Sequence, residues 1–174
     1  MPVADRWRSL RKTRMMRIEH NIQTCGLATK LTNSQTDNSK IIQSLWINFN
    51  CELKKYGITQ KGGNWTKFGI TYKIEDNYFY LAAIPSQNLA FPDKFICFEI
   101  PNGEYKVFTH KGKMENIKQT LFEIYKVILP KSNLNIKNDK QTGFIHFEKY
   151  DYRFQWNKPN SEIDIYLPLK TNNI

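Results

Sequence analysis

The stretch that decides the fold is Gln43-Ser44-Leu45-Trp46-Ile47-Asn48-Phe49, because its pattern returns as Gln119-Thr120-Leu121-Phe122-Glu123-Ile124-Tyr125. Every position is displaced by 76 residues (119 − 43), and the aromatic positions coincide. Around the first stretch, apolar residues recur at three- and four-residue steps, which places them on one face of a helix. We therefore predict equivalent helices over 40–56 and 114–129, the first capped by Asn38 or Ser39 and ended by Gly57.

Predicted strands flank each helix in the same order. The first helix follows an extended segment over 17–31 and precedes strands over 67–75 and 78–84. The second follows an extended segment over 95–109, interrupted at Pro101-Asn102-Gly103, and precedes strands over 143–152 and 161–169. This order predicts a tandem duplication of a β-α-β-β unit in one domain over 17–170, with repeats over about 17–90 and 91–170.

The duplication also aligns individual strand residues. With the displacement of 76, Phe68 falls on Phe144 and Tyr72 on Glu148, whereas the last strands align at a displacement of 83 (168 − 85). We therefore expect Tyr72 and Glu148 to line one cavity between the repeats.

Composition is that of an ordinary globular domain. The chain has 174 residues, 40% hydrophobic and 24% charged. No apolar run approaches the roughly 20 residues that a membrane-spanning helix needs, and no signal-peptide core follows the N-terminus. We expect a cytoplasmic protein that has no membrane partner.

Cysteines and histidines indicate neither a metal nor a cofactor. The three cysteines are odd in number and far apart, so we expect ordinary buried thiols. The histidines do not form a His-Glu-x-x-His cluster. The cysteines are Cys25, Cys51 and Cys97, and the histidines are His20, His110 and His146.

The net charge of +10 raises the question of a nucleic-acid partner. Six basic residues occupy the first 17 positions, which contain a single acid: Arg6, Arg8, Arg11, Lys12, Arg14 and Arg17 against Asp5. We interpret residues 1–16 as a flexible basic leader, and a nucleic-acid-binding arm is the alternative. The aromatic residues do not interleave with lysine and arginine as in RNA-binding strands, so nucleic acid is not favoured.

In the predicted strand over 143–152, a carboxylate lies among aromatic rings. Side chains alternate between two faces of a strand, and one face reads Phe144, His146, Glu148, Tyr150 and Tyr152. Aromatic faces attract cations, and a partly desolvated carboxylate adds complementary charge, so this face suits an apolar organic cation. A strand glutamate can also be merely solvated, and Trp46 and Phe49 on a helical face suit a core as well as a ligand cage.

Five short motifs follow one another along 16–170. They are Leu45-Trp46-Ile47-Asn48-Phe49, Phe68-Gly69-Ile70-Thr71-Tyr72, Gly103-Glu104-Tyr105, Phe147-Glu148-Lys149-Tyr150 and Ser161-Glu162-Ile163-Asp164-Ile165-Tyr166-Leu167-Pro168. Their order and spacing resemble the gyrase-inhibitor-like (GyrI-like) effector-binding domain. That domain is also the ligand-binding half of AraC-type, multidrug-responsive regulators, and it occurs free-standing in integron-cassette-encoded proteins.

The resemblance implies an α+β fold, in which two pseudo-symmetric halves form a curved antiparallel sheet with a helix each and a ligand pocket between the repeats. The acidic pocket residue of the family would map onto Glu148, from its Phe-Glu-x-Tyr context, and the acid of the final strand onto Glu162. Trp46 matches the aromatic helix position that borders the pocket. The other candidates for ligand contact are Tyr72, Phe49, Tyr150, Tyr166, Trp65, Phe79 and Tyr80.

These features favour non-catalytic binding of an amphipathic, cationic small molecule by a sensor, a sequestering protein or an accessory to a separate transcription regulator. About 16 residues precede the first predicted strand, too few for a helix-turn-helix domain, so we expect a stand-alone effector-binding domain. The alternatives are a hydrolase of reactive toxins, whose pocket carboxylate would position water, and a protein or nucleic-acid interaction module. The sequence contains no nucleophile motif or phosphate-binding loop, implies no cofactor and specifies no oligomeric state.

Overall fold

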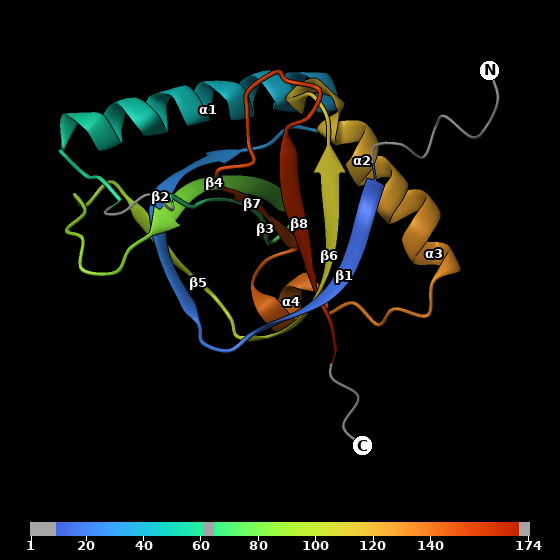
Figure 1. Cartoon of the computed structure of the whole chain (residues 1–174). Helices are drawn as coiled ribbons and strands as arrows, with labels where there is room; N and C mark the ends of the chain where they lie inside the picture. The colour runs from blue at the N-terminus through green and yellow to red at the C-terminus, as the bar shows by residue number, and fades with distance from the viewer. Residues whose placement is uncertain (1–9, 61–64, 171–174) are drawn as a thin grey trace.

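The computed structural model describes residues 10–60 and 65–170, which build an eight-stranded, curved, antiparallel sheet (Figure 1). The strands are β1 (Leu10–Ile18), β2 (Ile22–Lys30), β3 (Lys67–Ile74), β4 (Asn77–Pro85), β5 (Ile96–Ile100), β6 (Gly103–Lys111), β7 (His146–Tyr150) and β8 (Glu162–Pro168). Their order across the sheet is β1-β6-β8-β7-β3-β4-β2-β5. This architecture confirms the predicted α+β fold with a curved antiparallel sheet.

The strand order is symmetric about the central β7–β3 pair. On either side of it, β4 mirrors β8, β2 mirrors β6 and β5 mirrors β1. A duplicated unit produces this arrangement, but each repeat has one more strand than the predicted β-α-β-β unit. The two extra strands are exchanged, since β1 of the first repeat pairs with β6, and β5 of the second repeat pairs with β2.

Helix α1 (Gln35–Lys55) starts earlier than predicted because Ser34 caps it. The Ser34 hydroxyl accepts a hydrogen bond from the backbone N–H of Asp37 at 3.2 Å. Asn38, one of the predicted caps, instead accepts a hydrogen bond from a backbone N–H six residues earlier, at 2.7 Å. Beyond the helix, Gly57 has a φ of 63°, as glycine commonly has after a helix C-terminus.

The second predicted helix is not continuous. Pro130 has no N–H to donate to the carbonyl four residues before it, so the regular series of α-helical hydrogen bonds is interrupted there. The helical winding changes ahead of the proline. The segments are, in order, a 3₁₀ turn (Met114–Asn116), α2 (Ile117–Glu123), a π-helical segment (Ile124–Ile128), α3 (Leu129–Lys131) and, after a loop, α4 (Asp139–Thr142).

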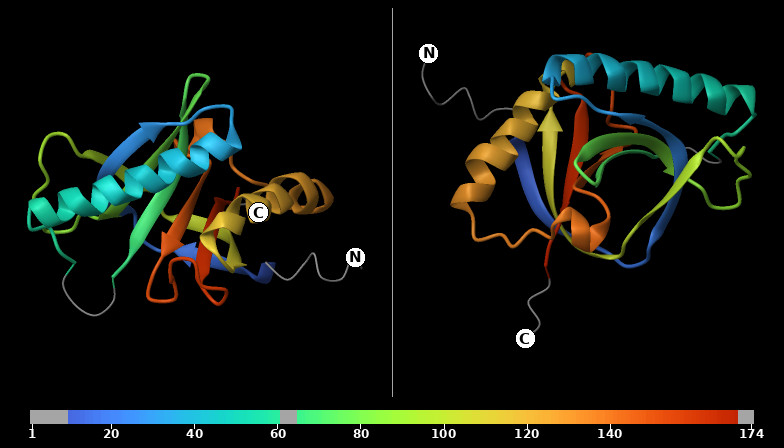
Figure 2. Two further views of the ribbon diagram at one scale, coloured as in Figure 1. Left: turned by 90° about the horizontal axis from the view of Figure 1, so that it is seen from above. Right: turned by 180° about the vertical axis from the view of Figure 1, so that it is seen from behind.

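Helices α1, α2 and α3 cover the outer face of the sheet (Figure 2), and a separate core of apolar side chains fills its curve. On the outer face, fully buried Phe49 packs α1 against β4, and fully buried Ile124 packs the π-helical segment against β6 and β8. Within the curve, a third cluster of apolar side chains includes Ile70, Tyr105 and Phe147. Each face of the sheet is therefore buried in its centre.

Part of the predicted leader belongs to the sheet. Residues 10–16 lie in β1, which pairs with β6, so the predicted boundary between leader and domain falls inside a strand. The Arg14 guanidinium donates a hydrogen bond to the carboxylate of Asp164 at 2.8 Å. Residues 1–9 of the predicted leader lie outside the described residues.

The prediction of three buried thiols is wrong. Cys25 and Cys97 form a disulfide between β2 and β5, where they are direct cross-strand partners. They are distant in sequence and become neighbours only through the exchange of β5. Cys51, on α1, is exposed.

Among residues 10–60 and 65–170, no helix is long and apolar enough to cross a membrane.

Candidate ligand-binding site

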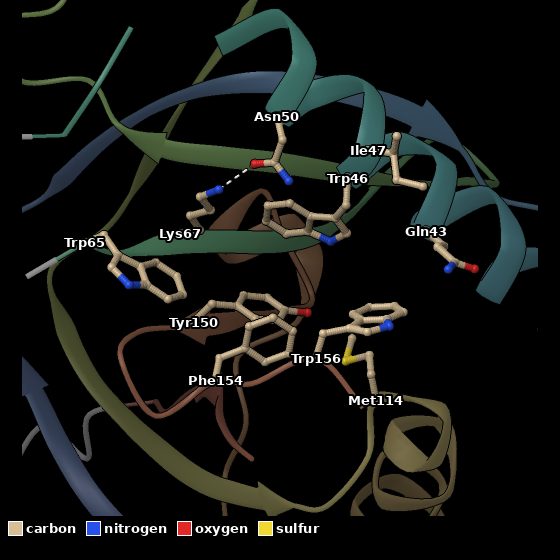
Figure 3. A pocket seen from close by; sticks show the side chains of 10 residues that line it. All are labelled: Gln43, Trp46, Ile47, Asn50, Trp65, Lys67, Met114, Tyr150, Phe154 and Trp156. Carbon is tan, nitrogen blue, oxygen red and sulfur yellow. Dashed lines mark hydrogen bonds between the residues drawn. The ribbon is translucent and has the colours of Figure 1, made fainter. Parts of the chain in front are cut away.

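A pocket of about 330 Å³ lies on the outer face of the sheet, near its central strand pair. Its walls come from α1, from β3 and the residues before it, from the end of β7 with the connection to β8, and from the turn ahead of α2 (Figure 3). The lining residues are Gln43, Trp46, Ile47, Asn50, Trp65, Lys67, Met114, Tyr150, Phe154 and Trp156. A volume of this size accommodates a small organic molecule.

Five of the ten lining residues are aromatic, and four of their rings meet edge to face. The Trp46 and Tyr150 rings are 5.2 Å apart between centroids, at 64°. Tyr150 and Phe154 are 5.1 Å apart at 89°, and Phe154 meets Trp156 at 6.5 Å. Trp156 is half exposed, with 54% of its surface accessible, so it stands at the rim. Such a wall offers ring faces and edges to an apolar ligand.

The carboxylate of Glu148 is buried behind the Tyr150 ring, and the residue is only 4% exposed. Its Oε2 accepts hydrogen bonds from the Tyr80 hydroxyl at 2.7 Å and from the Tyr150 hydroxyl at 2.6 Å. The Tyr80 hydroxyl in turn accepts one from the Trp46 indole N–H at 3.2 Å. Two pocket rings, Trp46 and Tyr150, are thus connected to one buried carboxylate.

Gly69 makes this arrangement possible. Tyr80 stands on β4 and Glu148 on β7, so their side chains must meet above β3, where Gly69 is the direct partner of Glu148. A Cβ atom on Gly69 would lie 1.9 Å from the Tyr80 hydroxyl oxygen and 2.8 Å from Oε2 of Glu148. The hydrogen bond therefore requires glycine at this position.

Burial shifts the pKa values of all three groups. It raises the pKa of Glu148, while the hydrogen bonds from Tyr150 and Tyr80 act in the opposite direction by favouring the carboxylate. Burial and the adjacent carboxylate hold the pKa values of Tyr80 and Tyr150 well above the ordinary tyrosine value. Both phenols therefore remain protonated donors.

Lys67 places a positive charge in the same pocket. It is half-buried, its ammonium contacts the side-chain carbonyl of Asn50, and it lies 5.9 Å from the centroid of the Trp65 ring (Figure 3). Burial lowers the pKa of Lys67. The pocket thus has a cation at one side and a carboxylate behind the Tyr150 wall.

An ionic cluster on the opposite face of the sheet holds the loop that carries Phe154. Asp164, 1% exposed, accepts hydrogen bonds from Arg14 at 2.8 Å, Arg153 at 2.6 Å and Thr109 at 2.6 Å. These partners lower the pKa of Asp164 to about 2, although burial alone would raise it. Because Arg153 directly precedes Phe154, the cluster positions one wall of the pocket from behind.

The structure brings half of the predicted site residues together. Trp46, Trp65 and Tyr150 line the pocket. Glu148 and Tyr80 lie behind Tyr150, and the Glu148 carboxylate accepts hydrogen bonds from both phenols. The other five predicted residues do not line the pocket.

Phe49 belongs to the core under α1, where its ring is 5.8 Å from that of Trp46. Tyr72 stacks on Phe79 with a centroid distance of 5.4 Å, and Tyr166 stacks on Phe147 at 4.6 Å in the core within the curve. Their strand positions put these side chains on the inner face of the sheet.

Glu162 and Glu148 point to opposite faces of the sheet. Glu162 forms ion pairs with Arg153 at 3.4 Å and Lys111 at 3.9 Å. The alignment of the two repeats that puts Tyr72 on Glu148 likewise pairs residues of opposite faces, since Tyr72 packs inside the curve. A displacement of 76 residues aligns the two helices but not the two faces of β3 and β7, because side chains alternate along a strand and only an odd displacement matches these faces.

Seven lining residues were missed by sequence reasoning. Three of them share one helical face with Trp46, since steps of three and four residues connect positions 43, 46, 47 and 50, which was a usable signal: Gln43, Ile47 and Asn50. The others carry no local signal, because they lie in a loop, in the 3₁₀ turn ahead of α2 or at the start of β3: Lys67, Met114, Phe154 and Trp156. Among the described residues no group of three or more His, Cys, Asp or Glu is arranged to hold a metal ion.

Comparison with known proteins adds a family and a fold. Residues 19–169 match a family described as integron-associated effector binding protein. The transcriptional regulator BrlR of Pseudomonas aeruginosa is 35% identical over 79 residues, which are 45% of this chain and 27% of BrlR. The chain therefore spans about a quarter of that curated relative.

Two solved structures share the fold. SAV2435 bound to tetraphenylphosphonium has a TM-score of 0.68 and 16% identity, with 92% of this chain and 94% of that chain covered. An integron cassette protein from the mobile metagenome of Vibrio cholerae has a TM-score of 0.59 and 15% identity, with 92% and 97% covered. At such identities the likeness concerns the fold alone.

Proposed function

The chain belongs to the family of integron-associated effector-binding proteins, and we propose that its aromatic pocket binds lipophilic organic cations. The observation that carries this proposal is the buried carboxylate of Glu148, held behind Tyr150 by two phenol hydrogen bonds at 2.6 and 2.7 Å. A cation that stacks on the wall approaches this negative charge without direct contact. Trp46, whose indole N–H donates a hydrogen bond to the Tyr80 hydroxyl, forms the adjoining part of the wall.

Electrostatics supports this choice of ligand. Ring faces carry negative potential and attract cations at close range. A phenol that donates to a carboxylate becomes more electron-rich, because hydrogen-bonded groups polarise one another in a low-dielectric interior. Glu148 thus strengthens the attraction of the Tyr150 ring in addition to its own long-range field. Burial of apolar rings contributes affinity with little directional demand, which favours a broad range of ligands.

We further propose that the ligand leaves unchanged and that its binding serves sensing or sequestration, alone or with a separate transcription regulator. The ligand bound to SAV2435 is itself a lipophilic cation, tetraphenylphosphonium. The curated relative BrlR is a transcriptional regulator. Mass spectrometry after prolonged incubation with stoichiometric protein tests the absence of turnover, and a hydrolysed ester in a panel of aromatic esters would contradict it.

Titration calorimetry with tetraphenylphosphonium tests the binding proposal. Glu148→Gln keeps an acceptor for both phenols but removes the charge, so we expect affinity to fall about tenfold or more, equivalent to about 1.4 kcal/mol. Trp46→Ala removes a wall and should weaken binding at least as much. Glu19→Gln, which removes a charge in the β1–β2 connection outside the pocket lining, is the control. Unchanged affinity in both pocket variants would refute the proposal.

A further inference from the structure

Lys67 is a charged residue inside an aromatic pocket that is proposed to take cations. It lines the pocket beside Asn50 and Trp65 and is half-buried. We propose that the preferred ligand is a zwitterion, an aromatic cation that also carries a carboxylate or similar anionic group, and that Lys67 binds that anionic group. The inference rests on the proposed function and narrows its ligand class.

The surroundings of Lys67 leave its charge unbalanced. Its ammonium contacts the neutral carbonyl of Asn50 and the Trp65 ring. No ion pair within residues 10–60 and 65–170 involves Lys67. Glu148 is committed to Tyr80 and Tyr150 instead.

A half-desolvated ammonium that has no counter-ion among the described residues is costly, and its lowered pKa reflects the desolvation. A ligand that is only a cation leaves the cost in place and adds repulsion. An anionic group near the ammonium relieves both effects, because a charge-assisted hydrogen bond forms in a site partly shielded from water. The aromatic pocket therefore discriminates against a simple cation on the Lys67 side.

The strand register places the two charged residues near each other on one face of the sheet. Lys67 pairs with Tyr150 across β3 and β7, and Glu148 pairs with Gly69. Lys67 and Glu148 are thus diagonal neighbours on one face, and such positions lie about 7–8 Å apart between Cα atoms. Because Tyr150 is the direct cross-strand partner of Lys67, a ligand that stacks on the Tyr150 ring can bring an anionic substituent to the Lys67 ammonium.

A matched ligand series tests this inference by calorimetry at pH 7.5. The compounds are tetraphenylphosphonium, (4-carboxyphenyl)triphenylphosphonium and the methyl ester of the latter. We expect the protein to bind the carboxylate about tenfold more tightly than either pure cation. Lys67→Met should abolish this preference and leave the affinity for tetraphenylphosphonium equal or higher, whereas Lys67→Arg should retain it. Lys149→Met, on the adjacent strand but the opposite face, is the control and should behave like the unmodified protein.

Two outcomes would overturn the inference: a carboxylate that binds no more tightly than its ester, or a preference that survives Lys67→Met in protein that unfolds normally in urea. If the pure cations bind in a Glu148-dependent manner without any preference for the carboxylate, only the zwitterion inference fails. If none of the three compounds binds, the proposed function fails and the zwitterion inference fails with it.

Discussion

Substitution of Gly69 by alanine tests whether Glu148, Tyr80 and β3 are arranged as described. The new Cβ would lie 1.9 Å from the Tyr80 hydroxyl oxygen and 2.6 Å from its Cζ, so the phenol must move by about 1.5 Å to reach van der Waals distance. This movement breaks the 2.7 Å hydrogen bond to the buried carboxylate. Loss of a hydrogen bond to a charged group costs about 1.5–3 kcal/mol, and overpacking adds about 1–3 kcal/mol.

Alanine recovers about 0.5–1 kcal/mol of backbone entropy that glycine loses on folding. The net expectation is a fall of about 3 kcal/mol in the free energy of unfolding, measured by urea denaturation. The same substitution in a Tyr80→Phe background should cost at least about 1 kcal/mol less, because the closest clashing atom is absent. A cost below about 1 kcal/mol, or an equal cost in both backgrounds, would refute the described packing of Gly69 against Tyr80 and Glu148.

Three further predictions concern the buried ionisable groups. The pKa of Asp164 falls from 3.8 to about 2 on folding, so its carboxylate adds about 2 kcal/mol to the free energy of unfolding above pH 3.8, and this contribution is lost towards pH 2. Asp164→Asn should therefore destabilise the protein at pH 7, and an unchanged urea midpoint would contradict this. His146 is buried, its Nε2 has no hydrogen-bond partner among the described residues, and burial lowers its pKa from 6.5 to about 4. Because the unfolded chain takes up a proton on this histidine first, the free energy of unfolding should fall by about 3 kcal/mol between pH 6.5 and 4. Urea titrations at each pH should show this dependence in the unmodified protein and not in His146→Gln. The pKa of Glu148 is raised above 4.5, so the affinity for tetraphenylphosphonium should fall as acid protonates this carboxylate; a profile equal to that of Glu148→Gln would oppose the proposed role.

Lys67 changes how selectivity in this pocket is understood. The proposed role of the acidic group behind the aromatic rings is to attract cations in general, and that role sets few limits on ligand shape. Under the zwitterion proposal, Lys67, directly across from Tyr150, adds a repulsive element for simple cations as well as an attractive one for zwitterions. Selectivity of this kind depends on how the ligand's charges match Glu148 and Lys67, and not on the pocket volume of about 330 Å³ alone.

Local sequence was sufficient where structure follows local periodicity. Apolar spacing predicted α1 over most of its length, and the strands predicted over 67–75 and 78–84 correspond to the β3–β4 hairpin. The spacing of aromatic residues around Glu148 identified its strand face, which does turn towards the pocket side of the sheet. Each of these features depends on residues within one element or one turn.

Strand faces across the repeats could not be predicted in the same way. The helix overlay places Tyr72 on Glu148, but Tyr72 faces the core inside the curve and Glu148 faces α1. A shift of one residue in strand register moves every side chain to the other face. Sequence similarity in the helices does not constrain that shift, because the connections between helix and strand differ in length.

The sequence by itself determined the duplicated α+β plan, the amphipathic α1 and a glutamate flanked by aromatic residues, because helical and strand periodicities are local properties. Only the tertiary structure decided the exchange of β1 and β5, the Cys25–Cys97 disulfide and the presence of Lys67, Phe154 and Trp156 around one pocket. Those features depend on pairing between distant segments. The register between β3 and β7 places Gly69 opposite Glu148 and Lys67 opposite Tyr150, and that non-local choice of register sets the two charges of the site.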